Sequence, residues 1–115
     1  MFIREEFKAA SKDGGVINEN ELIIYQPAAA SSSYYVVFDF NTKADTTLTI
    51  TQYWYYNSTW NTASYPKKVV LSNGTTTENN SATPLIISIP SGQNVQLQCH
   101  TNGNAYARKF VLNFS

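Results

Sequence analysis

Few residues of this chain have the chemistry of a catalytic centre. His100 is the only histidine and Cys99 is the only cysteine, and the two are neighbours. Side chains that are adjacent on a β-strand point to opposite faces, so this thiol and imidazole cannot form a nucleophile–base pair. One residue of each type is also too few for a zinc site. We expect Cys99 to be a core thiol and His100 to lie at the surface.

The carboxylates do not form a catalytic pair that the sequence reveals. A glycosidase needs two of them across a cleft, and a domain of this size offers little cleft. The segment Asn18-Glu19-Asn20-Glu21 is rich in oxygen but lacks the glycine and the ligand spacing of a calcium loop. The sequence therefore predicts a protein that is not an enzyme and that uses no metal or other cofactor, with a small hydrolase as a weaker alternative. The eight carboxylates are Glu5, Glu6, Asp13, Glu19, Glu21, Asp39, Asp45 and Glu78.

The stretch that suggests binding is YWYYNSTW, residues 53–60, in which five of the eight residues are aromatic. If a strand that begins at Thr46 continues to Tyr56, its apolar residues mark one face as inward and its threonines mark the other as outward. Trp54 is then a core residue. The inward set is Leu48, Ile50, Gln52, Trp54 and Tyr56, and the outward set is Thr47, Thr49, Thr51, Tyr53 and Tyr55.

Rings on the outward side predict a partly exposed aromatic patch near the end of a sheet. Such rings pack against the C–H face of a sugar, while asparagine and threonine side chains bond its hydroxyl groups. Tyrosine and tryptophan are also favoured where proteins contact one another. Ordinary packing of aromatic residues over a sheet edge is the third explanation. The predicted ligand-binding residues are Tyr53, Tyr55, Asn57, Trp60 and Tyr65.

Gln52 conflicts with this assignment, because an amide then points into the core in the middle of the strand. A β-bulge at Gln52 would reset the alternation and exchange the faces of the residues that follow it. Both assignments are kept open.

The elements that would position these residues are β-strands, because the dominant hydrophobic period along the chain is two. Turn signals such as Asn73-Gly74 and Ser91-Gly92 separate the strands. Residues 2–11 fit either a helix or a first strand that runs into a loop, and residues 73–84 read as a long polar loop. Pro84 and Pro90 flank one strand and favour a place at a sheet edge. The predicted strands are 21–25, 34–40, 46–56, 67–71, 84–89, 94–100 and 105–114.

Seven or eight short strands with turns every 8–12 residues or so predict an all-β fold. We expect a single antiparallel β-sandwich of the jelly-roll or Greek-key type that covers residues 1–115 as one domain. Val37, Val111 and Ile86 fall on faces that are nominally outward. Apolar residues on both sides of a strand favour a second covering layer, and another subunit in a homo-oligomer would supply it.

Composition narrows the choice of partner. Eight basic and eight acidic residues balance, and only 14% of the chain is charged, so nucleic acid is an unlikely ligand. The apolar runs are too short to span a membrane, and the charged N-terminus does not resemble a signal peptide. We expect a protein that is cytoplasmic, part of a virion, or secreted by a non-classical route.

The sequence therefore predicts a non-catalytic binding or assembly module. Strands rich in threonine, asparagine and tyrosine, a neutral net charge and a single cysteine suit a surface component of a phage-like or secreted particle or oligomer. The alternative is a lectin or carbohydrate-binding module that uses the aromatic patch. In either case the partner is a glycan or a protein surface.

Overall fold

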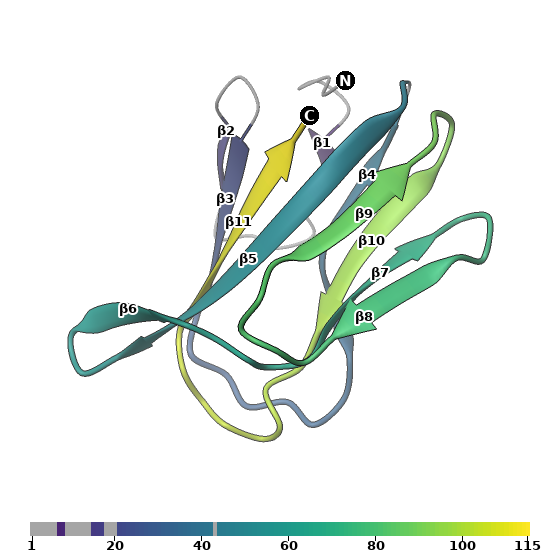
Figure 1. Cartoon of the computed structure of the whole chain (residues 1–115). Helices are drawn as coiled ribbons and strands as arrows, with labels where there is room; N and C mark the ends of the chain where they lie inside the picture. The colour runs from purple at the N-terminus through teal and green to yellow at the C-terminus, as the bar shows by residue number, and fades with distance from the viewer. Residues whose placement is uncertain (1–6, 9–14, 18–20, 43) are drawn as a thin grey trace.

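A computed structural model describes residues 7–8, 15–17, 21–42 and 44–115. The regular structure in this part of the chain is entirely β-strand, and the strands form two sheets that pack face to face (Figure 1). The described residues include no helix long and apolar enough to cross a membrane.

The first sheet is built around β5, the longest strand. Its strand order is β2-β3-β11-β5, and two further strands share the far side of β5. β9 pairs with the first half of β5, at residues 46–50, and β6 pairs with the last part, at residues 53–56. The strands are β2 (Gly15–Ile17), β3 (Glu21–Gln26), β5 (Thr46–Tyr56), β6 (Thr59–Thr62), β9 (Leu85–Ile89) and β11 (Arg108–Phe114).

The second sheet has the order β1-β4-β10-β7-β8, and every pairing in both sheets is antiparallel. Its strands are β1 (Phe7–Lys8), β4 (Tyr35–Asn41), β7 (Lys67–Leu71), β8 (Thr76–Asn79) and β10 (Asn94–Cys99). β10 is therefore the central strand of this sheet, with β4 and β7 on either side of it.

The strand order is that of a jelly roll, which confirms the predicted fold class. Four strands of one sheet, β3-β11-β5-β9, face four of the other, β4-β10-β7-β8. From β3 onward the chain changes sheet at every connection except the β5–β6 and β7–β8 hairpins. Two interlocked Greek keys of this kind define the jelly roll.

The core lies between the sheets and follows the alternation of the strands. In β9 and β10, for example, every second residue is buried, because one face of each strand packs on the opposite sheet while the other meets solvent. The largest buried apolar side chains include Phe38, Phe110, Leu22, Ile24, Leu48, Ile50, Ile89, Leu97 and Leu112.

All seven predicted strands are present, with ends that differ by three residues or fewer. β9 pairs only with β5 among the described residues, which places it at a sheet edge as its flanking prolines predicted. Three strands were not predicted, and the first is β2 (Gly15–Ile17), which begins at a glycine that reads as part of a turn. β8 lies inside the stretch that was read as a polar loop, and β6 follows the aromatic run. Of residues 2–11, Phe7–Lys8 form β1 and the others lie outside the described residues.

One assignment of faces was wrong, in β4. Val37 was placed outward, whereas it is fully buried and its neighbour Val36 is 37% exposed. The pairing with β10 shifts here, because Leu97 lies opposite Phe38 and Gln98 lies opposite Val36, which leaves Val37 as the extra residue of a β-bulge. Val37 therefore gives no support to an outer covering layer.

β5 has no bulge at Gln52. Its pairing with β11 runs without a shift from Leu48 to Trp54, and Gln52 is buried on the inner face opposite Phe110. The regular assignment of faces is therefore correct along this stretch, and an amide lies inside the core.

Candidate binding surfaces

The last residues of β5 and the whole of β6 form a two-stranded arm that extends past the end of the sandwich (Figure 1). Asn57 and Ser58 turn the chain with φ angles of 57° and 61°. Two consecutive residues with positive φ make a type I′ turn, the turn whose twist matches a hairpin. Asn57 is therefore exposed at the tip of the arm, where its main role is to close the hairpin.

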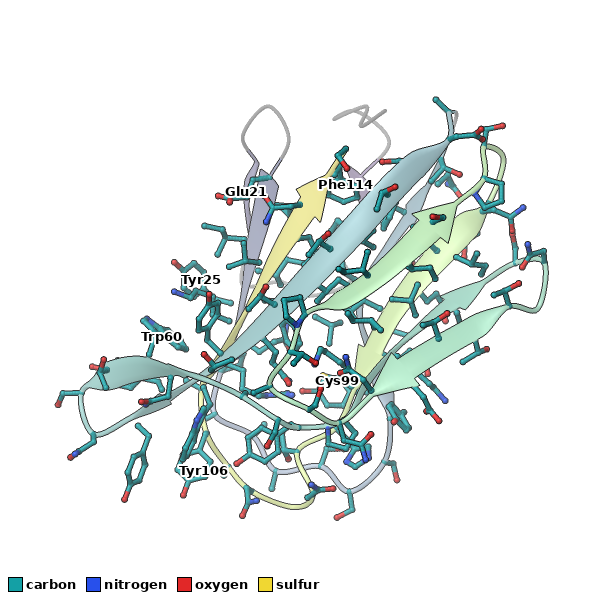
Figure 2. The ribbon with its side chains drawn as sticks, in the orientation of Figure 1. Glu21, Tyr25, Trp60, Cys99, Tyr106 and Phe114 are labelled. Carbon is teal, nitrogen blue, oxygen red and sulfur yellow. The ribbon has the colours of Figure 1, made fainter. Side chains whose placement is uncertain are left out.

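The arm carries aromatic residues on both faces, because neighbouring side chains of β5 alternate. Tyr53 and Tyr55 lie on the outer face of the sheet, while Trp54 and Tyr56 continue the inner face beyond the point where the second sheet covers it. Figure 2 shows Trp60 and Tyr25 on one side of this ribbon and Tyr106 on the other. Residues 53–56 therefore contribute side chains to two separate surfaces.

The first surface, which we call the outer cluster, consists of Tyr25, Tyr53, Tyr55, Trp60 and Lys109. The rings of Tyr55 and Trp60 meet edge to face with their centres 5.1 Å apart, and those of Tyr25 and Trp60 lie 6.1 Å apart. Tyr25 and Tyr53 flank Lys109 in adjacent strands of the sheet. Tyr25 and Tyr55 are exposed, and the other three are half-buried.

Lys109 connects the rings of the outer cluster. Its Nζ lies 4.8 Å from the centre of the Tyr53 ring and 4.9 Å from that of Trp60. Both distances suit a cation–π contact. One face of each of these two rings is therefore directed at the ammonium group.

The remainder of the outer face is mixed apolar and threonine. Val111 lies between Ile23 of β3 and Thr51 of β5 and is half-buried. Ile86, on the edge strand β9, is 63% exposed. Both residues point outward as predicted, with threonines of β5 between them.

The second surface, which we call the end cluster, consists of Trp54, Tyr56, Tyr65 and Tyr106. Trp54 and Tyr56 stack with an interplanar angle of 20° and 4.9 Å between centres. Tyr106 stands at 80° to both rings, with its centre 4.6 Å from Trp54 and 5.9 Å from Tyr56. Tyr65 meets Trp54 edge to face at 6.2 Å. Burial raises the pKa of Tyr65, and the neighbouring Tyr106 adds to the effect.

Trp54 was expected in the core, and this was wrong, whereas Tyr56 shares the face of Trp54 as predicted and stacks on it. Trp54 is half-buried and Tyr56 is 50% exposed. The strand continues past the end of the opposing sheet, so its inner face is covered there by loop residues instead of by strands. The end cluster covers this open end of the sandwich.

The structure divides the predicted ligand-binding set. It brings Tyr53, Tyr55 and Trp60 together, places Tyr65 in the end cluster and leaves Asn57 at the tip of the arm. Tyr25 and Lys109 were missed, because only the strand register places β3 and β11 beside β5. Tyr106 was missed because it was read as part of a strand at 105–114, whereas β11 begins at Arg108 and Tyr106 lies in the loop before it.

Cys99 is the last residue of β10, and His100 follows the strand. Cys99 is buried in the core, and burial raises the pKa of its thiol well above the ordinary value. His100 is half-buried on the outer face of the second sheet, where its ring meets Tyr34 edge to face at 4.6 Å. Its Nδ1 accepts a hydrogen bond from the backbone N–H of Asn102. No nucleophile–base pair results.

An open hollow of about 370 Å³ lies at the other end of the sandwich, where β5 begins. It is lined by Asp45, Thr46, Thr47, Ser88, Ile89, Pro90 and Ser115. The hollow touches neither aromatic cluster. Within the described part of the chain, no group of three or more histidine, cysteine, aspartate or glutamate residues is placed to hold a metal ion.

The chain matches no known family model, and it shows no significant similarity to a curated protein or to a solved structure.

Proposed function

We propose that this chain is a non-catalytic assembly module that binds a protein surface, in the first instance a second copy of itself, through the outer face of the β3-β11-β5 sheet. In this proposal it is a surface component of an oligomer or of a phage-like or secreted particle. The observation that carries the proposal is the outer cluster, in which four aromatic rings and a lysine lie together on the solvent side of the sheet.

The composition of this face favours a protein partner. Tyrosine and tryptophan are the residues that most often dominate binding energy at protein interfaces, and they do so where apolar surface surrounds them. Here Val111 and Ile86 add apolar side chains to the outer face of the same sheet. Because Lys109 already contacts Tyr53 and Trp60, those two rings offer less free surface for stacking on a sugar.

A second copy of the chain can associate without long-range repulsion between net charges. The chain has no formal net charge, so two copies do not repel each other at long range. The fold does not decide the matter, because jelly rolls occur both in viral capsid proteins and in lectins. The arrangement of residues on the outer face is what favours a protein partner.

The proposal is tested by native mass spectrometry and sedimentation velocity over a wide range of protein concentration. We expect the wild-type chain to associate and Trp60→Ala to shift the equilibrium towards monomer. Tyr106→Ala, which removes a ring from the end cluster, is the matched control and should associate as the wild type does. A wild-type chain that stays monomeric at every concentration contradicts the proposal.

A carbohydrate-binding function is the second candidate, and one observation favours it at the end cluster. The exposed Tyr56 ring stacks on Trp54, while Tyr106 stands nearly perpendicular to it. This corner offers a flat ring and an aromatic wall. Asn61 lies beside it, with its side-chain amide donating to the backbone oxygens of Tyr56 and Thr59. A neutral sugar would place its C–H face on the Tyr56 ring.

The two candidates give different results in a fluorescence titration with a panel of neutral glycans. Binding at the end cluster should change the emission of Trp54, and Tyr56→Ala should abolish the change while Trp60→Ala preserves it. If no glycan changes the emission of the wild-type chain, the carbohydrate function is rejected at this surface.

A further inference from the structure

The end of the core beneath the end cluster contains polar side chains that are sealed from solvent. Arg108 is 0% exposed and Gln52 is 1% exposed. Arg108 lies opposite Gln26 of β3 and Trp54 of β5, and Gln52 lies two residues from Trp54 on the same inner face. Diagonal neighbours in a sheet are within reach of long side chains. Arg108, Gln52 and Gln26 therefore direct their polar groups into one region.

The hydrogen bonds of these groups are incomplete. Arg108 donates from Nη1 to the Sγ of Cys99 at 3.1 Å. Its Nε and Nη2, both side-chain amide atoms of Gln52, and the Nε2 of Gln26 have no partner among the described residues. Four of these five atoms are donors, and only the Oε1 of Gln52 is an acceptor. The region therefore has a surplus of buried donors, which ordinarily find partners in folded proteins.

The charge of Arg108 is also uncompensated by the described residues. The four described carboxylates are directed elsewhere, because Glu21, Asp39 and Glu78 alternate outward on their strands and Asp45 lies in a loop. The rings of Tyr35 and Phe110 lie 5.6 Å from the guanidinium carbon and stabilise the cation only in part. Burial lowers the pKa of Arg108 to about 10, which leaves it positively charged at neutral pH.

A buried cation with spare donors fits an anion. We propose that this end of the core holds one small monovalent anion of the halide class between the guanidinium of Arg108 and the side-chain amide of Gln52. A single positive charge matches a single negative charge, and in this region the unpartnered donors outnumber the one unpartnered acceptor, the Oε1 of Gln52. Trp54, Tyr35 and Phe110 then form the apolar walls of the site, and the end cluster closes it from solvent.

The first test uses the wild-type chain crystallised in sodium bromide. Bromide scatters anomalously, so a bound ion gives an anomalous difference peak within hydrogen-bonding distance of Arg108. We expect this peak and, in solution, an unfolding temperature that rises with bromide concentration at constant ionic strength when bromide replaces gluconate. An ordered water without anomalous signal, or equal unfolding temperatures in bromide and gluconate, overturns the proposal.

The second test uses variants. Arg108→Met keeps a long side chain and removes the charge, so the bromide dependence of the unfolding temperature should disappear. Lys68→Met removes one positive charge from the outer face of the other sheet and should keep the dependence. Gln52→Leu, which also removes a proposed ligand, replaces Arg108→Met if that variant does not fold, and it should weaken the bromide dependence. If the variant that is measured has the same bromide dependence of its unfolding temperature as the wild type, the proposed site is contradicted.

Discussion

The ammonium nitrogen of Lys109 lies 4.9 Å from the centre of the Trp60 indole, although the two residues come from strands that do not pair with each other. Lys109 is in β11 and Trp60 is in β6, and β5 runs between them. The lysine side chain therefore reaches across Tyr53 to the arm. This contact ties the arm to the body of the sheet and gives the outer cluster a defined shape.

The contact between Lys109 and Trp60 should be measurable as a coupling energy. In a double-mutant cycle with Lys109→Met and Trp60→Leu, we expect a coupling of about 0.5–1 kcal/mol in the free energy of unfolding, as for exposed cation–π pairs. Urea denaturation of the four proteins gives the value. Strictly additive effects would mean that the lysine does not hold the arm.

The burial of Cys99 predicts a specific dependence of stability on pH. The folded thiol has a raised pKa, so above about pH 9 the unfolded chain loses this proton while the folded chain keeps it. The contribution of the protonated Cys99 thiol to the free energy of unfolding is therefore complete below that pH and is lost as the pH rises. The stability of the wild type relative to Cys99→Ala should fall by about 1.4 kcal/mol between roughly pH 8 and pH 10. A difference that does not change with pH contradicts this account, as would rapid reaction of the native thiol with a disulfide reagent.

The bulge in β4 predicts unequal losses of stability when two neighbouring valines are replaced by alanine. Val37→Ala removes buried methyl groups and should lower the free energy of unfolding by about 2 kcal/mol. Val36→Ala, one residue away on the exposed side, should change it by less than about 0.5 kcal/mol. Equilibrium denaturation of both variants makes the comparison. If Val36→Ala lowered the free energy of unfolding more than Val37→Ala, the bulge would be contradicted and the regular alternation that the sequence suggested would be correct.

The turn of the arm stores some backbone strain at Ser58, whose φ is 61°. A glycine adopts this conformation without a steric penalty, so Ser58→Gly should raise the free energy of unfolding by roughly 0.5–1 kcal/mol. Thr59→Gly, at the first residue of β6, provides the control and should lower it, because glycine weakens a strand. A loss of stability in Ser58→Gly would show that the turn has another conformation.

Much of the fold follows from the sequence because its strands alternate cleanly. In β10 and β9 every second residue is apolar and buried, so both the strand and its inner face could be predicted. β8 could not, because Thr76–Asn79 contains no apolar residue. It is a strand because its backbone pairs with β7 at the edge of the sheet. The bulge at Val37 escaped prediction for the same kind of reason, since the register with β10 creates it.

The candidate surfaces were predictable only in part. Alternation correctly separated Tyr53 and Tyr55 from Trp54. The alternation could not show that β5 extends beyond the end of the opposing sheet. Because it does, Trp54 and Tyr56 belong to the end cluster and not to the core. Arg108 lies at the first residue of a strand, where a charged side chain is ordinarily exposed, and only the packing of the two sheets buries it.

The central claim is that the outer face of the first sheet is the contact surface, and Tyr55 and Tyr56 allow the sharpest test of it. These neighbours are the same residue type with similar exposure, 44% and 50%, on opposite faces of the arm. The measurement is the dissociation constant of the oligomer by sedimentation velocity for Tyr55→Ser and for Tyr56→Ser. We expect Tyr55→Ser to weaken association at least about tenfold, a loss near 1.4 kcal/mol, and Tyr56→Ser to leave it unchanged. Weaker association in Tyr56→Ser alone, or no change in either variant, would contradict the account.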